Sequence, residues 1–329
     1  MDKKVVFSAI QPSGSLTIGN YLGALSNFAD LQKDYQCIYC VADMHAITVQ
    51  QKPADLRRRT LDLIALYVAC GIDPEESLLY IQSQVPEHAE LTWVLNTITS
   101  IGQLNRMTQF KDKSKKQKEV YAGLLNYPVL MVSDILLYQT SYVPVGEDQR
   151  QHIELTRDIA ERFNTRYSPT FTVPEIMAPK VGARIMSLQN PAVKMSKSDA
   201  DENAFILILD EPDVIRRKIK RAVTDSVGEV HYSDEQPGVK NLLDIYSSFK
   251  KIDPDEAERE FASAGYGELK ECVAEAVVEG LSPVQEKYKE IRGDKKELER
   301  ICRHGAERAH YMASKTLKKV YRKVGFVQF

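Results

Sequence analysis

The chain has 329 residues, of which 43% are hydrophobic and 27% are charged, and its formal net charge is −2. These values predict a globular protein with enough chain for one large domain or two ordinary ones. No apolar run approaches the ~20 residues of a membrane-spanning helix, and residues 1–8 turn polar too early for a signal peptide. We therefore expect a cytoplasmic protein without a membrane partner.

The five cysteines are scattered along the chain, and their odd number argues against a disulfide framework and for a reducing compartment. Cys37 and Cys40 have the spacing of half a zinc site, but no second pair or histidine-rich partner accompanies them. They alternate with the apolar residues Ile38 and Val41, so we expect small core side chains. The sequence predicts no metal-binding residues.

Short strand-like runs alternate with helical patterns through the first half of the chain. Val5–Ile10, Gln36–Ala42 and Leu78–Gln82 are rich in Val, Ile and Tyr, which favours strands. Leu56–Val68 has apolar residues at spacings of three and four, which is typical of a helix with one buried face, and Gly71–Pro74 marks its end. This alternation predicts an α/β fold, with a doubly wound parallel sheet covered by helices on both faces.

A different pattern begins near residue 190, where strand-like runs become rare. Helical patterns rich in Leu, Ala, Glu and Lys then follow one another: Leu242–Phe249, Pro254–Ala262, Tyr266–Glu279, Pro283–Arg292 and Lys296–Lys323. We therefore expect an α/β domain over residues 1–190 and a helical domain over residues 191–329.

Two polar segments are suited to hold phosphate groups. Gln11–Gly14 follows the first strand, and ligands of parallel sheets bind beyond the carboxyl ends of the strands. Gly19 stands at the start of the next helical pattern, where a missing Cβ and free backbone N–H groups leave room for a nucleotide. Far along the chain, Lys194–Ser198 combines two ammonium groups with two small hydroxyls. Either segment alone could equally be an ordinary loop or helix entry.

Taken together, the segments resemble the two nucleotide-binding motifs of the class I aminoacyl-tRNA synthetases: Thr17-Ile18-Gly19-Asn20 and Lys194-Met195-Ser196-Lys197-Ser198. The second matches letter for letter, and the first has the form of the bacterial, tryptophan-specific members. The resemblance covers nearly the whole chain. It implies a Rossmann-like catalytic domain followed by an all-helical anticodon-binding domain. It also implies ATP-dependent activation of L-tryptophan, release of pyrophosphate, and transfer to tRNA(Trp).

The resemblance further assigns roles to single residues. Lys194, Lys197 and Lys113 would neutralise charge on the leaving pyrophosphate, although the stretch around Lys113 could equally be a solvated basic loop. Thr17 and Asn20 stand where the family more usually has histidines and would donate hydrogen bonds to phosphate oxygens. Mg²⁺ should accompany ATP, held mainly by phosphate oxygens and water.

A block after the strand-like run Tyr142–Val145 resembles the family's contact to the ribose. It begins Gly146-Glu147-Asp148-Gln149, and by itself could equally be a helix start with acidic residues in its first turn. The implied nucleotide site comprises Gln11, Pro12, Ser13, Gly19, Asn20, Gly146, Glu147, Asp148, Ile185, Lys194, Met195, Ser196, Lys197 and Ser198. His152, a lone histidine on the following helix, is expected to be structural.

One carboxylate interrupts the apolar helical pattern Tyr127–Tyr138. Helical spacing places Asp134 on the same side as Tyr127 and Met131, and a carboxylate on an apolar face needs a partner. A structural hydrogen bond or a buried ion pair would explain it, and so would a ligand donor. An indole has one donor and no acceptor, which suits an acceptor-only carboxylate.

The family resemblance favours this ligand role. It implies that Asp134 accepts from the indole N–H and that Met131 packs on the ring. Further pocket walls would be Phe7, His45 and Val145, and contacts to the ammonium and carboxylate would come from Tyr127, Gln11 and Gln149. Tyrosine is the close competitor, because a carboxylate also accepts from a phenol. The chain departs from the family at Ala9, where glycine is more common, and at Met44, where glutamine is common.

Basic residues are grouped in Arg216–Arg221 and Lys315–Lys323, although either run could be a solvated helix face. The implied partners are tRNA(Trp) and L-tryptophan, and no DNA. We expect Lys315–Lys323 to follow phosphates or to pack back on the catalytic domain. A homodimer is also implied, with Leu91–Leu104 or Tyr127–Tyr138 as sources of an interface.

Two other functions fit part of the pattern. Small nucleotidyltransferases share the first motif and the fold, but they lack a long helical second domain. A synthetase-like protein without catalysis should have broken nucleotide motifs, whereas all three are intact here. An active synthetase therefore ranks first.

Overall fold

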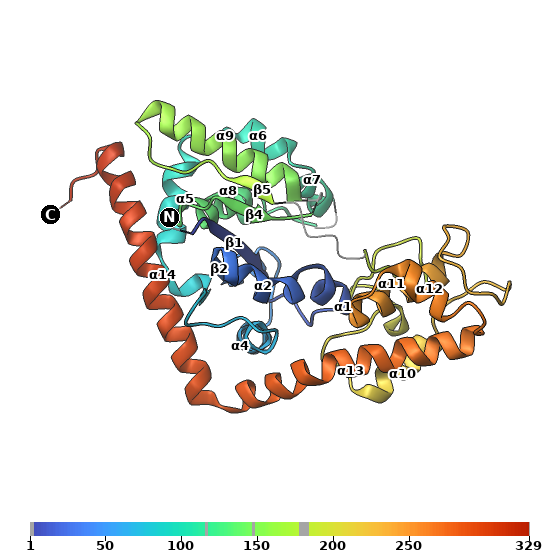
Figure 1. Ribbon diagram of the computed structural model, residues 1–329. Coiled ribbons are helices and arrows are strands. Elements are labelled where there is room, and N and C mark those ends of the chain that lie inside the picture. Colours follow the sequence, from blue (N-terminus) through green and yellow to red (C-terminus); the bar gives the residue numbers. More distant parts are fainter. Residues whose placement is uncertain (1–2, 116–117, 147–148, 178–183, 329) are drawn as a thin grey trace.

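The computed structural model describes residues 3–115, 118–146, 149–177 and 184–328. Its centre is a sheet of five parallel strands in the order β3-β2-β1-β4-β5 (Figure 1). The strands are β1 (Val5–Ile10), β2 (Gln36–Val41), β3 (Leu78–Ile81), β4 (Tyr142–Pro144) and β5 (Glu175–Met177). The predicted doubly wound parallel sheet is confirmed.

Helices surround the sheet and are the main regular structure in the described second half of the chain. Before residue 178 these are α1 (Ile18–Asn20), a π-helical turn (Tyr21–Leu25), α2 (Ser26–Asp34), α3 (Asp43–Ala46), α4 (Pro53–Ala69), a 3₁₀ turn (Gln82–Gln84), α5 (Glu87–Asn96), α6 (Ile101–Arg106), α7 (Thr108–Ser114), α8 (Ala122–Leu136) and α9 (Arg150–Arg166). After residue 183 they are a 3₁₀ turn (Glu202–Ala204), α10 (Pro212–Lys220), α11 (Pro237–Lys250), α12 (Pro254–Glu260), α13 (Tyr266–Gly293) and α14 (Lys295–Val324). Within the described ranges, no helix is long and apolar enough to cross a membrane.

Both faces of the sheet are buried, as a parallel sheet requires. Cys37 and Tyr39 of β2 join the core formed with α2 and α4, whereas Ile38 and Cys40 join the core formed with α5 and α8. Since Cys37 and Cys40 point to opposite faces, they cannot hold one metal ion together. All five cysteines are free, and Cys37 and Cys40 are buried, which confirms the prediction of core cysteines for this pair.

Helix α13 corrects one prediction from the sequence. The stretches Tyr266–Glu279 and Pro283–Arg292 were separate helical patterns, but the structure has one continuous helix with Pro283 inside it. A proline removes one backbone donor and strains the preceding turn. Leu281 and Val284 on either side of it are buried in the core, and this packing holds the helix together across the proline.

Helix α8 has most of its apolar side chains inside the core of the chain. Val129, Val132 and Ile135 are fully buried between the sheet, α5 and α9. On α5 and α6, by contrast, Trp93 and Ile101 are 71% and 67% exposed.

The C-terminal helix α14 covers the edge strand β3, and Figure 1 shows it as a long red helix along the side of the molecule. Ala309 and Ala313 are fully buried there. An ideal Cβ on Gly305 would lie 1.8 Å from the carbonyl oxygen of Leu79, so only glycine allows this approach. The contact shields an edge that would otherwise be open to pairing with another chain.

We predict that Gly305→Ala lowers the free energy of unfolding by about 1–3 kcal/mol, because α14 must move away from β3. Gly267→Ala is the matched control, since a Cβ added in α13 at that position meets no atom within 4 Å. Urea unfolding of both variants checks this. Equal stability of Gly305→Ala and the unchanged protein would contradict the packing described here.

Candidate active site

A cavity of about 670 Å³ opens at the carboxyl ends of β1 and β4, where the direction of strand order reverses. Residues from both halves of the chain form its wall. Most of the predicted site residues lie there: Phe7, Gln11, Ser13, Thr17, Asn20, His45, Lys113, Tyr127, Met131, Asp134, Val145, Gly146, Gln149, Lys194, Met195, Ser196, Lys197 and Ser198. The structure therefore brings three separate motifs together around one space.

A few predicted residues lie elsewhere. Glu147 and Asp148 fall outside the described residues. Pro12, Gly19 and Ile185 are not part of the wall; Gly19 lies behind it, with 3.6 Å between an ideal Cβ on Gly19 and the Cβ of Ile185.

Two departures from the family are also placed. Ala9 lines the cavity, whereas Met44 does not and donates its backbone N–H to Oε1 of Gln82 at 3.1 Å.

Backbone pairing holds the two halves of the wall together. The N–H of Ile18 donates to the carbonyl of Ile206 at 3.0 Å, and the N–H of Ile208 donates to the carbonyl of Leu16 at 2.9 Å. The lysine-containing segment 194–198 is anchored in turn by a bridge between Lys194 and Met186. As a result, the segment after β1 faces the segment of Lys194 and Lys197.

Asn20 and Thr17 cap each other at the start of α1. The backbone N–H and the hydroxyl of Thr17 both donate to Oδ1 of Asn20, at 3.0 and 3.1 Å. This contact fixes the oxygen end of the Asn20 amide and leaves its Nδ2 as the donor end on the cavity wall. Thr17 itself is buried and serves mainly to orient Asn20.

Two half-buried lysines supply positive charge. Nζ of Lys197 donates to Oγ of Ser13 at 3.4 Å. Burial lowers the pKa of Lys197, and the charge of Arg59 lowers it further. Gly14 has a φ of +142°, and a Cβ at this position would lie only 3.1 Å from Nζ of Lys197. A glycine here therefore leaves room for the ammonium group.

Lys113 is the second of these lysines, and its local structure differs from the loop considered above. It belongs to helix α7, and its Nζ lies over the ring of Tyr127, 4.6 Å from the centroid. Burial lowers the pKa of Lys113. Burial also raises the pKa of Tyr127 to about 12, so its phenol stays neutral. Behind it, Nε2 of the buried His152 lies 3.1 Å from the Tyr127 hydroxyl, outside the cavity wall.

Asp134 lines the same cavity and is almost completely buried. Its Oδ2 is 2.7 Å from Nε2 of His45, and its Oδ1 is 2.6 Å from Nδ1 of His88 and 2.7 Å from Nε2 of Gln82. Burial alone would raise the pKa of Asp134. Attraction to His45, with hydrogen bonds from both histidines, outweighs burial and holds the pKa below its ordinary value. Asp134 is therefore an ionised acceptor at the closed end of the cavity.

Gln82 and His88 were missed at the level of sequence. Gln82 follows directly after β3, at the same sheet edge as Gln11 after β1, and that position was a usable signal. His88 carries no such signal, because it is neither in a motif nor in the cavity wall.

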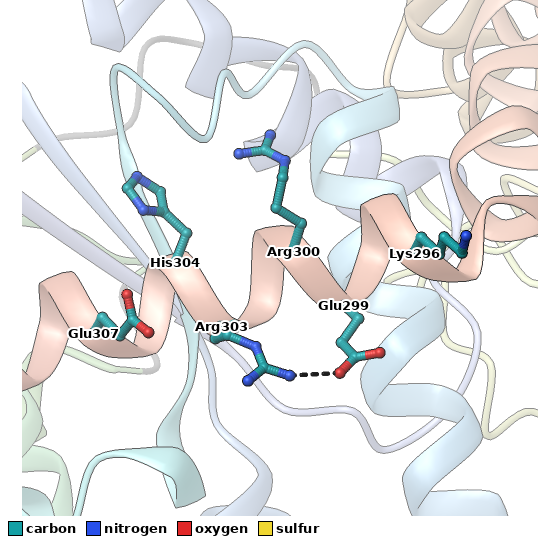
Figure 2. A pocket seen from close by; sticks show the side chains of 6 residues that line it. All are labelled: Lys296, Glu299, Arg300, Arg303, His304 and Glu307. Carbon is teal, nitrogen blue, oxygen red and sulfur yellow. Dashed lines mark hydrogen bonds and ion pairs between the residues drawn. The ribbon is translucent and has the colours of Figure 1, made fainter.

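A second hollow, of about 420 Å³, lies on the outer face of α14 (Figure 2). Its wall consists of charged side chains: Lys296, Glu299, Arg300, Arg303, His304 and Glu307. Arg303 pairs with Glu299 at 2.6 Å, and Arg300 pairs with Glu75 at 2.9 Å. These pairs tie α14 together and to the turn before β3.

Chemically, the first cavity combines two contrasting ends. Ammonium groups and amide donors at one end suit a polyphosphate. An apolar slot with a single carboxylate at the other end suits an apolar group that carries one hydrogen-bond donor. Among the described residues, no group of three or more His, Cys, Asp or Glu side chains could hold a metal ion.

Comparisons with known proteins agree with this geometry. The family model for tRNA synthetases class I (W and Y) matches residues 2–282. The tryptophan–tRNA ligase of Clostridium perfringens is 60% identical over 326 residues, which are 99% of this chain and 98% of that protein. The tryptophan–tRNA ligase of Bacillus subtilis is 53% identical over 324 residues, 98% of each chain.

The solved structures include a tryptophanyl-tRNA synthetase from Campylobacter jejuni complexed with ADP and tryptophan. It has a TM-score of 0.86 at 34% identity and covers 98% of this chain and 100% of its own. The fold, the cavity and these full-length similarities lead to one assignment: the chain belongs to the class I tRNA synthetases of the tryptophan and tyrosine family.

Proposed function

We propose that this protein activates L-tryptophan with ATP, releases pyrophosphate and transfers the tryptophanyl group to tRNA(Trp). The observation that carries the proposal is the buried, ionised Asp134 at the apolar end of a cavity whose other end holds the lysines. The full-length relatives named tryptophan–tRNA ligase support it, and so does the ADP and tryptophan complex of the related synthetase.

Adenylation requires the carboxylate of tryptophan to attack the α-phosphorus of ATP in line, with pyrophosphate leaving. No covalent nucleophile is needed, so the protein acts by positioning and by charge. Asp134 accepts from the indole N–H, and Met131 and Phe7 contact the ring. Gln11 and Gln149 also line the cavity and would contact the amino and carboxylate groups of the substrate.

The positive groups act on the phosphates. Lys194 and Lys197 neutralise the charge that develops on pyrophosphate, and the Nδ2 of Asn20 donates to a phosphate oxygen. Lys113, above the Tyr127 ring, lies nearer to the amino-acid end and serves the α-phosphate side of the reaction.

Mg²⁺ fits this site as a companion of ATP and not as a protein-held ion. The one described carboxylate in the cavity wall, Asp134, is already occupied by three protein side chains. Phosphate oxygens and water would therefore supply the ligands, which is usual for Mg²⁺ at nucleotide sites. Bound in this way, Mg²⁺ supplies charge neutralisation on the phosphates.

The two parts of the chain divide the work. Residues 1–190 hold the substrates, and residues 191–329 contribute the Lys194–Ser198 segment and the helices that recognise the anticodon. The lysines of α14 have two roles. Lys318 and Lys319 are exposed and would contact tRNA phosphates, whereas Nζ of Lys323 donates to Oγ1 of Thr170 at 2.7 Å and packs the helix on the first part of the chain.

A homodimer of cytoplasmic location completes the proposal. The exposed Trp93 and Ile101 supply apolar area on α5 and α6, on the pattern Leu91–Leu104 that was expected to form an interface. The cytoplasmic location follows from the proposed activity, because tRNA is charged in the compartment where proteins are synthesised.

The decisive experiment is exchange of labelled pyrophosphate into ATP, measured with tryptophan, with tyrosine and with no amino acid. We expect exchange with tryptophan alone. Asp134→Asn should raise the KM for tryptophan by about 100-fold or more, because an amide N–H would then face the indole N–H. Exchange with tyrosine only would refute the role of Asp134, and absence of exchange with either would refute the enzyme assignment.

A second prediction concerns Lys197. Its charge is present below its pKa and is lost above it, and burial lowers that pKa. The KM for ATP should therefore rise at alkaline pH, earlier than for an ordinary lysine. Lys197→Arg, which stays charged, should reduce this rise, and the remainder belongs to Lys113, whose pKa is also lowered by burial. Lys197→Met should lower kcat by about 100-fold at neutral pH. A pH profile of the exchange reaction tests all three, and identical profiles for the lysine and arginine enzymes would contradict the assignment.

A third prediction concerns tRNA. Changing Lys318 and Lys319 to Glu should weaken tRNA binding and make its salt dependence shallower, by about one unit of slope for each lost phosphate contact. Lys295→Glu with Lys296→Glu, at the other end of α14, is the control with the same change in charge. Filter binding at several salt concentrations measures both. Unchanged affinity and slope in the first variant would exclude phosphate contacts at these lysines.

A further inference from the structure

His88 is a buried histidine that the catalytic scheme above does not use. It has no solvent exposure and lies behind the cavity wall, on the first turn of α5. Its Nδ1 is 2.6 Å from Oδ1 of Asp134. On the other side of the ring, Nε2 lies 3.0 Å from the hydroxyl of Tyr138 and 3.1 Å from that of Tyr80.

The contacts of Asp134 can be counted against its capacity. An ionised carboxylate offers about four acceptor positions, two on each oxygen. His88 and Gln82 fill both positions on Oδ1, and His45 fills one on Oδ2. A single acceptor position on Oδ2 is left for a ligand in the cavity.

The donors around Asp134 are themselves held in place. Oε1 of Gln82 accepts the backbone N–H of Met44, so Nε2 of the same amide must face Asp134. Because an ionised carboxylate only accepts, Nδ1 of His88 must carry the donated proton. The hydroxyl of Ser133, next to Asp134 on α8, donates to the carbonyl of His88 at 2.9 Å and fixes the distance between the two helices.

We propose that His88 is a positioning residue for substrate choice. By saturating Oδ1, it keeps Asp134 ionised and unable to rotate, so that the cavity presents one fixed acceptor to one N–H donor. This inference rests on the proposed tryptophan function and adds the source of its selectivity. Sites built around a hydrogen bond to the substrate penalise analogues without the donor, since a buried polar group is then left unpaired.

Loss of the His88 ring should relax that penalty. Without it, Oδ1 has a vacant position, and the carboxyl can rotate or take up a proton in its buried environment. A carboxyl that has rotated or become protonated no longer depends on the ligand for a hydrogen bond, so a ligand without an N–H then costs little binding energy. Binding of tryptophan should weaken, and discrimination against an analogue without the donor should fall.

The test compares tryptophan with its benzothiophene analogue, in which sulfur replaces the indole N–H. Pyrophosphate exchange gives kcat/KM for both, with active sites counted by titration. In the unchanged enzyme we expect a ratio of about 100 or more in favour of tryptophan. His88→Leu should reduce the ratio at least tenfold, mainly through the KM for tryptophan. His88→Asn, whose Nδ2 can replace Nδ1 as donor, should restore most of it.

Controls separate this role from simple support of the fold. Thr140→Val removes a buried hydrogen bond to the carbonyl of Ile135, beside the end of α8, without touching Asp134. It should leave the ratio unchanged even where it lowers stability. Tyr138→Phe removes a hydroxyl that holds Nε2 of His88 and should lower the ratio about threefold. This variant tests the inference if His88→Leu does not fold.

The outcomes are distinct. A ratio in His88→Leu, or in Tyr138→Phe, equal to that of the unchanged enzyme would overturn this inference and leave the proposed function intact. Failure of the unchanged enzyme to exchange with tryptophan would overturn the proposed function itself.

Discussion

The short backbone pairing between segments 16–18 and 206–208 is the contact on which the site depends. Two hydrogen bonds, from Ile18 to Ile206 and from Ile208 to Leu16, join stretches about 190 residues apart in sequence. They place the turn after β1 opposite the lysines of segment 194–198. Since neither stretch forms a complete wall alone, the cavity exists only because the second half of the chain folds back onto the first.

The cavity separates charge along its length, and burial makes that separation effective. Lys197 is half-buried, which strengthens its interaction with an anion relative to that of an exposed lysine. Asp134, at the other end, would be costly in an apolar slot without its three protein partners. The same partners that stabilise it in the fold also define how much acceptor capacity remains for a ligand. The structural role of this carboxylate and its proposed role toward a ligand therefore coincide.

Local patterns were reliable where one rule decided the outcome. Runs rich in Val, Ile and Tyr located the first three strands, and the spacing in Leu56–Val68 located α4. They failed where packing overrode a local signal. Pro283 does not break α13 because the residues beside it are buried. The apolar pattern of α8 indicated burial but not what would cover it, since a subunit core and a subunit interface have the same composition.

The sequence by itself determined the class of fold, the two polar segments suited to phosphate and the single carboxylate in an apolar helix. These features depend on the order and spacing of residues within short stretches. Only the tertiary structure decided that His45, Gln82 and His88 converge on Asp134, and that Gly305 seats α14 against β3. Such contacts join residues that are distant in sequence, and their geometry arises from packing of whole elements, which no local pattern encodes.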